Sequence, residues 1–509
     1  MPPTRPTILL TSVILFTLLL ASAHHGPFAL AAKRNVVLFV TDDQSQDMGC
    51  YGNHVVKTPN MDALAADGTR FRNAFCTTAS CSASRSVILS GLHNHANGQY
   101  GHQHHFHKFS AYDNILSLPV YLSHAGFRTA RCGKYHVAPE AVYKFETVIP
   151  GPTRSPVVMA NNCEAFLKEE SDAPFFLYIC TSDPHRGGGT ANELPYKPDR
   201  FGNPPPGKTY PGVTEVVYDP EDVIVPGFLP DTPTCRAEIA QYYQSISRID
   251  RGLGRLIEIL KQAGQWDDTL FLYISDHGIA MPGAKTTLYE GGMVSPCLVR
   301  NPYLENRGVV TDAMISWVDL APTIVDFAGA LDPQTGQVQQ AVLDKIPRNK
   351  SRSDPQTTND TKPGRFHGRS FLSVLDQENP DGWDVAYASH TFHEIQMYYP
   401  MRVVRERRYK LIWNIAHPLP FPFASDLWAA PTWQAQYQLG MDAPYGAKTV
   451  GSYIQRPEFE LFDLKNDPYE GHNLAGDPQH AQLLEQMKAK LKQFQRRTAD
   501  PWIIKWTYE

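Results

Sequence analysis

Residues 81–91, CSASRSVILSG, place a thiol and an arginine within a predicted short helix. Small residues and a later apolar turn favour the helix, and Gly91 can take the left-handed conformation that ends one. Cys81 would then lie at the positive end of the helix dipole, with Arg85 one turn further on. Backbone N–H groups and a guanidinium that converge at one place attract anions. The segment therefore predicts an anion-binding site that includes a cysteine.

Carboxylates that follow two apolar segments predict a cation site. Asp42 and Asp43 follow the run NVVLFVT, and Asp276 follows the run TLFLYIS. Three carboxylates in one crevice would repel one another unless a cation lay among them, and oxygen ligands favour Ca²⁺ or Mg²⁺ over zinc. His277, next to Asp276, leaves two interpretations open: it contacts the substrate, or the metal is a softer one.

Basic and proton-carrying side chains complete the predicted site. The set consists of Arg85, Lys134, His136, His185 and Lys285. A tetrahedral anion beside a divalent cation needs such partners to neutralise its oxygens, and a histidine can protonate a leaving group. Any one of these residues alone would more commonly lie on the surface, so the prediction rests on the set.

Four apolar runs, rich in β-branched and aromatic residues, are expected to position these side chains. The predicted strands are residues 35–41, 127–132, 174–181 and 269–275, and the clearest helical pattern covers residues 235–264. Such strands alternating with helices indicate a parallel sheet covered on both faces. Ligand sites in these sheets form at the carboxyl ends of the strands. Because the acids, histidines and a lysine follow the strands directly, we expect a single site.

The chain is expected to hold two domains after a signal peptide, because 509 residues exceed one ordinary core. We assign residues 1–23 to the signal peptide, 24–375 to the domain with the site and 376–509 to a smaller α+β domain. In the last segment, strand patterns precede an amphipathic helix. The polar stretch 331–367 is interpreted as a surface excursion.

Composition and charge exclude other classes of protein. The net charge of −5 argues against a nucleic-acid binder, which normally carries a basic face. The apolar run 8–20 is shorter than a spanning helix needs, so we expect cleavage rather than anchoring, and a mature chain outside the cytosol. Eight cysteines are too few for a disulfide scaffold, although the sequence leaves undecided whether one or two disulfide bonds form. Asn349 and Asn359 begin sequons that matter in a eukaryotic host.

The motifs resemble those of the type I sulfatase family. CSASR followed by VILSG is similar to the family signature, and LFVTDDQ, GKYH, DPHR and SDHG are similar to its other site blocks, in the family's order, from about Lys33 to the C-terminus. Within the family, GKYHVAPEAVYKF, YDPEDVIVPGFLPDTP and HEIQMYYPMR resemble the heparan sulfamidase branch. The resemblance implies an alkaline-phosphatase-like α/β/α sandwich with a large mixed, mostly parallel sheet and a smaller C-terminal α+β domain. It also implies removal of N-linked sulfate from glucosamine in heparan sulfate-type glycans.

The same resemblance implies the cofactors. Cys81 matches the position that a formylglycine-generating enzyme oxidises to formylglycine, whose hydrate attacks sulfur; a buried structural cysteine is the alternative. One divalent ion, Ca²⁺ or else Mg²⁺, would be held by Asp42, Asp43, Cys81, Asp276 and His277. The chain departs from the pattern at three positions: Ala83 replaces the usual proline, and His277 and Lys285 replace an asparagine and an arginine of the sulfamidases.

Residue roles also follow from the resemblance. The catalytic set would be Cys81, Arg85, Lys134, His136, His185 and Lys285. Within it, His185 would protonate the leaving amine and His136 would assist sulfate release. His393, Glu394 and Arg402 are expected to bind the substrate as a wall of the sugar pocket; for Arg402, a structural salt bridge is an equal alternative.

Several alternatives stay open at this point. An O-sulfatase on another sulfated glycan, a phosphatase or phosphodiesterase, and an inactive glycan-binding protein with an unconverted Cys81 all fit parts of the pattern. The histidine-rich segment 93–107 suggests a metal tract by composition, but we expect a loop that lines the pocket, as in the resembling enzymes. The resemblance further implies a homodimer. It also implies a location in the lysosome if the host is a eukaryote, and in the periplasm or outside the cell if the host is a bacterium.

Overall fold

A computed structural model describes residues 1–2, 34–347 and 362–507. The residues from Lys33 to Glu509 form one compact unit, separate from Met1–Ala32. The predicted signal peptide and both sequons lie outside the described residues, so these expectations stay predictions. No helix among the described residues has the length and apolar character needed to cross a membrane.

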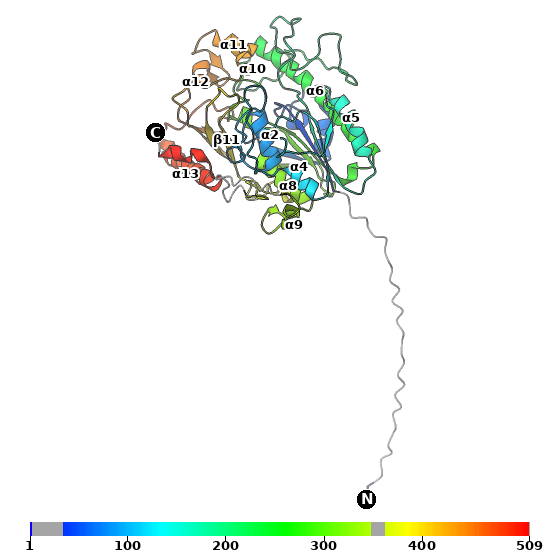
Figure 1. Cartoon of the computed structure of the whole chain (residues 1–509). Coiled ribbons are helices and arrows are strands. Elements are labelled where there is room, and N and C mark those ends of the chain that lie inside the picture. Colours follow the sequence, from blue (N-terminus) through cyan, green and yellow to red (C-terminus); the bar gives the residue numbers. More distant parts are fainter. Residues whose placement is uncertain (3–33, 348–361, 508–509) are drawn as a thin grey trace. The chain divides into compact units, whose positions relative to one another are not determined.

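An eight-stranded sheet forms the centre of the Lys33–Glu509 unit (Figure 1). Its strand order is β4-β3-β5-β1-β6-β7-β2-β8. The strands are β1 (Asn35–Thr41), β2 (Thr69–Phe75), β3 (Arg128–Gly133), β4 (Thr147–Ile149), β5 (Phe175–Cys180), β6 (Thr269–Ser275), β7 (Cys297–Arg300) and β8 (Val309–Ser316). Only β7 runs antiparallel to its neighbours. The four predicted strands are therefore confirmed, and the sheet is mixed and mostly parallel as expected.

Helices cover both faces of this sheet. Successive side chains of a strand point to opposite faces, and those of β1 are buried in two different cores, one on each face. Val37 and Phe39 join one core and Leu38 and Val40 the other. The first face packs against α1 (Pro59–Ala66), α5 (Pro156–Lys168) and α6 (Pro233–Gln262), and the second against α2 (Cys81–Ser90), α4 (Leu118–His124) and α8 (Leu320–Phe327). Figure 1 shows α5 and α6 on one side of the sheet and α2, α4 and α8 on the other.

A second, antiparallel sheet follows in the order β11-β12-β13-β16. Its strands are β11 (Val385–His390), β12 (Met401–Glu406), β13 (Tyr409–Asn414) and β16 (Phe459–Asp463), and α13 (Ala481–Arg497) covers one face. Met401 and Val403 on the other face belong to the same core as β1. Both sheets thus share one core within a single compact unit, and a domain boundary at residue 375 stays a prediction.

Short elements complete the described chain. They are α3 (Asn94–Asn97), α7 (Glu290–Met293), α9 (Gln340–Leu343), α10 (Ser425–Trp428), α11 (Pro431–Tyr437), α12 (Val450–Ile454), and the strands β9 (Leu331–Asp332), β10 (Gln337–Val338), β14 (Pro444–Tyr445) and β15 (Lys448–Thr449). The described beginning of the polar stretch, residues 331–347, is not wholly a surface excursion, because Val338 and Val342 are buried in the core. All eight cysteines lie in the described ranges and are free thiols.

Candidate active site

The carboxyl ends of the central strands converge on one pocket of about 580 Å³. Asp42 and Asp43 follow β1, Lys134 and His136 follow β3, His185 follows β5, and Asp276 and His277 follow β6. Most of these residues line the pocket together with Cys81, Lys285, His393 and Glu394. The structure thus brings together side chains from four strand ends, as parallel strands in one sheet require.

Helix α2 begins at Cys81, as its sequence predicted. Ser80 is the extended residue before it, and Gly91 closes it in the left-handed conformation with φ 68°. The Cys81 side chain is fully buried. Its Sγ lies 3.6 Å from Asp43 Oδ1 and 3.3 Å from His277 Nε2. The thiol therefore sits at the helix start, in the middle of the acidic and histidine groups.

The Cys81 thiol is poorly suited to act as a nucleophile itself. Burial, followed by the charge of Asp42, raises its pKa well above the ordinary value. Since the thiolate is the reactive form of cysteine, a thiol held protonated in this way contributes little reactivity.

Arg85 holds two of the carboxylates in place. Its guanidinium lies 3.3 Å from Asp42 Oδ1 and 3.0 Å from Asp276 Oδ2, and all three side chains are fully buried. It also donates to the carbonyl of Lys134 at 3.3 Å. The guanidinium therefore contacts the two carboxylates and the backbone after β3, and these contacts fix the positions of the carboxylates.

The acidic residues carry unequal charge. Burial opposes ionisation of Asp42, but Lys134, His185 and Arg85 outweigh it and lower the pKa of this carboxyl well below its usual range. For Asp276, burial and the neighbouring Asp42 prevail and raise the pKa to about 6. The basic side chains therefore do not fully compensate the carboxylates, and negative charge stays crowded around Asp276. A bound cation would relieve this crowding.

The donor atoms fit a metal ion. One ligand atom each from Asp42, Asp43, Cys81 and His185 lies within 4.8 Å of the others, and the same holds for Cys81, Asp276 and His277. His277 Nδ1 lies 3.0 Å from the carbonyl of Gly278. Because a carbonyl only accepts, Nδ1 donates to it, and Nε2, which lies 3.1 Å from Asp43 Oδ1, is the nitrogen left to share a cation with that oxygen. His277 can therefore join the carboxylates as a ligand.

Lys285 connects the two parts of the pocket. Its Nζ lies 2.9 Å from Asp43 Oδ2, from His185 Nε2 and from Asp426 Oδ2. Asp426, on α10, was missed by sequence reasoning because it belongs to no recognisable motif and is 141 positions from Lys285. No signal in the sequence alone would have paired these two residues.

His185 offers one nitrogen for proton transfer. Its Nδ1 donates to the carbonyl of Arg186 at 2.6 Å, which leaves Nε2 beside Lys285. Burial and Lys285 lower the pKa of His185, and its side chain keeps 25% of its surface exposed. His185 also lines the pocket, so its ring can approach a bound group.

The three predicted sugar contacts have different outcomes. His393 and Glu394 line the pocket, and Glu394 Oε1 accepts from Ser425 Oγ at 2.9 Å. Arg402 does not line it: its guanidinium is fully buried and paired with Asp500 at 2.5 Å. The substrate-binding interpretation of Arg402 is therefore corrected in favour of the salt bridge, since a side chain that is committed to a buried carboxylate cannot reach the sugar.

The histidine-rich segment is divided between two places. His102 and His104 line the pocket, as the loop interpretation expected. His93 and His95 instead stack on each other and pack against His367 and Phe494 of α13. Only part of the segment therefore serves the site.

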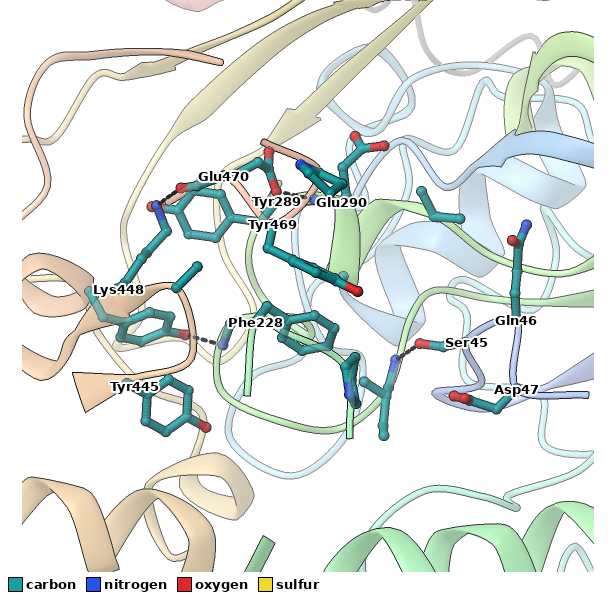
Figure 2. A pocket seen from close by; sticks show the side chains of 18 residues that line it. Ser45, Gln46, Asp47, Phe228, Tyr289, Glu290, Tyr445, Lys448, Tyr469 and Glu470 are labelled. Atoms are coloured by element: carbon teal, nitrogen blue, oxygen red, sulfur yellow. Dashed lines mark hydrogen bonds between the residues drawn. The ribbon is translucent and has the colours of Figure 1, made fainter. Parts of the chain in front are cut away.

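A second cavity of about 390 Å³ lies apart from these residues. Figure 2 shows Phe228, Tyr289, Tyr445 and Tyr469 around it, with Lys448 donating to the backbone of Glu470 at its edge. None of the predicted catalytic, metal or substrate residues lines it. The chemistry expected from the sequence is thus confined to the first pocket.

Comparison with known proteins assigns the class. The sulfatase family profile matches residues 34–330, and the chain belongs to the sulfatase family. It is accordingly a hydrolase of sulfuric esters or sulfamides, as the motifs predicted. The chain is similar to N-sulphoglucosamine sulphohydrolase of Homo sapiens, with 37% identity over 484 residues that cover 93% of this chain and 92% of that protein.

Solved structures support the fold. A protein in complex with its substrate D-glucosamine-2-N,6-O-disulfate matches with a TM-score of 0.62 at 20% identity, over 92% of this chain and 99% of that chain. The phosphonate monoester hydrolase of Agrobacterium radiobacter matches with a TM-score of 0.62 at 18% identity, over 92% and 94%. At these identities the likeness establishes the architecture, which confirms the predicted alkaline-phosphatase-like sandwich.

Proposed function

We propose that this protein removes N-linked sulfate from glucosamine residues of heparan sulfate-type glycans. The observation that carries the proposal is the similarity at 37% identity, along nearly the whole chain, to an enzyme named for that reaction. The pocket supports it, because buried acids, lysines and histidines surround Cys81 at the strand ends. An O-sulfatase activity has no comparable support: another relative, an ulvan-active sulfatase of Formosa agariphila, is 27% identical.

The proposal includes conversion of Cys81 to formylglycine and one divalent ion, Ca²⁺, held by Asp42, Asp43, Asp276, His277 and residue 81. When present, the formylglycine hydrate supplies the oxygen that attacks sulfur, and the ion polarises the sulfate oxygens. The position of the thiol between Asp43 and His277 supports the conversion, and the charge crowding at Asp276 supports the ion. A secretory location, a homodimer and the modifying enzyme as a partner remain parts of this proposal.

The chain's own residues would divide the remaining work. Lys134 and Lys285 lie on the pocket wall, where their charges neutralise sulfate oxygens. Asp43 accepts a proton from the nucleophile at position 81, which it faces. His185, whose Nε2 accepts from Lys285 Nζ, would first take up a proton and then protonate the departing amine, and His136, also on the wall, would assist the release of sulfate. Arg85 positions Asp42 and Asp276.

Calcium is expected to stabilise the folded chain through the acidic residues. A ligand at one hundred times its dissociation constant contributes about 2.7 kcal/mol, so the melting temperature should rise with added Ca²⁺ and fall with a chelator. Asp276→Asn should remove most of this response. Differential scanning calorimetry measures it, with Asp267→Asn, whose side chain is 92% exposed, as the control. An unchanged calcium response in Asp276→Asn would rule out the proposed ligands.

Glu394 is expected to contribute to sugar recognition. Its carboxylate lines the pocket and can accept a sugar hydroxyl or face the ammonium that forms when the N–S bond breaks. Loss of a hydrogen bond to a charged group costs about 1.5–3 kcal/mol, so Glu394→Gln should lower kcat/KM on N-sulfoglucosamine about tenfold to a hundredfold. A small aryl sulfate should be hydrolysed as before.

A comparison of the two substrates distinguishes a role of Glu394 in sugar binding from a role in the structure of the protein. Ser425→Ala, which removes the neighbouring donor to Glu394, serves as the control because it leaves the carboxylate in place. Equal losses on the sugar and the aryl sulfate in Glu394→Gln would place Glu394 in the structural framework. An absence of activity on N-sulfoglucosamine in the unaltered protein would refute the proposed function itself.

A further inference from the structure

Three imidazoles meet at one side of the pocket, and the proposed reaction uses only one of them. We call His102, His104 and His136 the histidine triad. His104 Nδ1 lies 2.5 Å from His136 Nε2, and one ring nitrogen of each of the three lies within 4.8 Å of the others. Two members come from the loop after α3 and one from the segment after β3, so the fold brings them together from separate parts of the chain.

The surroundings of the histidine triad keep its three rings neutral. Burial, followed by Lys285, lowers the pKa of His102 well below its ordinary value, and burial followed by Lys134 does so for His136. Burial, followed by the neighbouring His105 and His107, lowers the pKa of His104 to about 4. All three rings are therefore neutral near pH 7, which is the form that binds metals.

Neighbouring contacts orient the rings of the histidine triad. His102 Nδ1 lies 3.4 Å from Ser82 Oγ, which leaves its Nε2 for another partner. His107, also close, is already engaged because its Nδ1 accepts from the backbone of Ile395 at 3.1 Å. A side contact that fixes one ring nitrogen is the usual arrangement around a metal-binding histidine.

The distances suit a small ion with nitrogen ligands. Two nitrogen ligands of a tetrahedral Zn²⁺ with bonds of about 2.0–2.1 Å are about 3.3 Å apart. His104 Nδ1 and His136 Nε2, which share a hydrogen bond at 2.5 Å without an ion, would move apart by about 0.8 Å when Zn²⁺ takes the place of the proton between them. Neutral imidazoles select Zn²⁺ over Ca²⁺, which prefers oxygen. We propose that the histidine triad is a second metal site, separate from the carboxylates, that binds Zn²⁺ with three nitrogens and leaves its fourth position open to the pocket.

Occupancy of the histidine triad would inhibit the enzyme. The ion would take the Nε2 lone pair of His136 and occupy the wall where the substrate must enter. This consequence rests on the proposed function, whereas the binding itself does not. Zinc would thus act as a reversible inhibitor of a reaction that uses calcium.

Titration calorimetry with ZnCl₂ tests the site in the full-length mature protein, with Ca²⁺ kept in excess. We expect one tight Zn²⁺ per chain, and Co²⁺ in its place should give the visible absorption of a tetrahedral nitrogen site. His104→Asn should weaken zinc binding at least about tenfold and remove the Co²⁺ spectrum. His105→Asn, which changes the adjacent exposed histidine, should bind both ions as the unaltered protein does.

Two results would overturn the proposal. One is the absence of Zn²⁺ binding to the unaltered protein in excess calcium, and the other is equal zinc affinity in His104→Asn. The inhibitory consequence is measured separately, as the zinc concentration that halves the rate of each variant relative to its own zinc-free rate. That concentration should rise at least about tenfold in His104→Asn and stay constant in His105→Asn. Binding without any hydrolytic activity would refute the proposed function and leave the zinc site standing.

Discussion

Replacement of Cys81 by alanine is expected to lower kcat by at least about a thousandfold, because loss of a nucleophile removes the step on which all later ones depend. The side chain lies at the start of α2, fully buried between Asp43 and His277. Its removal takes away few packing contacts, so the melting temperature should change little. Hydrolysis of both N-sulfoglucosamine and an aryl sulfate should be lost together.

Cys297→Ala is the matched control for this experiment. Cys297 is another fully buried free thiol, on β7, and it does not line the pocket. Its variant should keep nearly all activity. Peptide mass spectrometry of the unaltered active protein should find an aldehyde in place of the thiol at position 81. Full activity with an intact thiol at that position would contradict the proposed nucleophile.

Replacement of Arg402 by methionine is expected to destabilise the fold by about 3–5 kcal/mol, because it leaves a buried carboxylate without its partner. Arg402 and Asp500 have fully buried side chains, 2.5 Å apart, and the guanidinium also donates to the carbonyls of His390 and Met401. Chemical denaturation measures the change. The KM of the folded variant should stay constant, because the side chain does not line the pocket.

Arg407→Met provides the control on an exposed ion pair. Arg407 contacts Asp312 at 2.7 Å with 38% of its side chain exposed, and such pairs contribute at most about 1 kcal/mol. A loss for Arg402→Met no larger than this would contradict the stabilising role of the buried pair, and a raised KM would restore Arg402 as a substrate contact.

The Arg402 pair also predicts a dependence of stability on pH. Burial opposes ionisation of Asp500, but Arg402 prevails and holds the pKa of this carboxyl well below its usual range. The folded-state pKa is thus lower than the unfolded value of about 3.9, so the stabilisation is present above pH of about 4 and is lost as the pH falls below it. Arg402→Met should reduce this acid sensitivity.

Much of the site could be predicted because the sequence places it directly after buried strands. A run such as NVVLFVT is a strand on composition alone, and the next two residues must then lie at the sheet edge. The alternation of strands and helices makes the strands parallel, so their ends face the same way. Helix α2 was equally predictable, since Gly91 marks its end.

The rest of the site could not be predicted, because it depends on contacts between residues that are far apart in the sequence. Asp426 reaches Lys285 from a short helix in the C-terminal half, and nothing in its neighbourhood in the sequence signals a catalytic partner. For Arg402 the sequence left two interpretations open, because a charged residue in an apolar stretch fits a binding wall and a buried ion pair equally well, and the structure supports the ion pair. Its partner, Asp500, is 98 positions away.

The most direct test of the proposed function is a product assay on two defined saccharides, one with a terminal N-sulfoglucosamine and one with a terminal 6-O-sulfated N-acetylglucosamine. Purified protein with Ca²⁺ should release sulfate and a free amine in equal amounts from the first saccharide and leave the second intact. Release of sulfate from the O-sulfated saccharide, with the N-sulfated one untouched, would contradict the proposed activity.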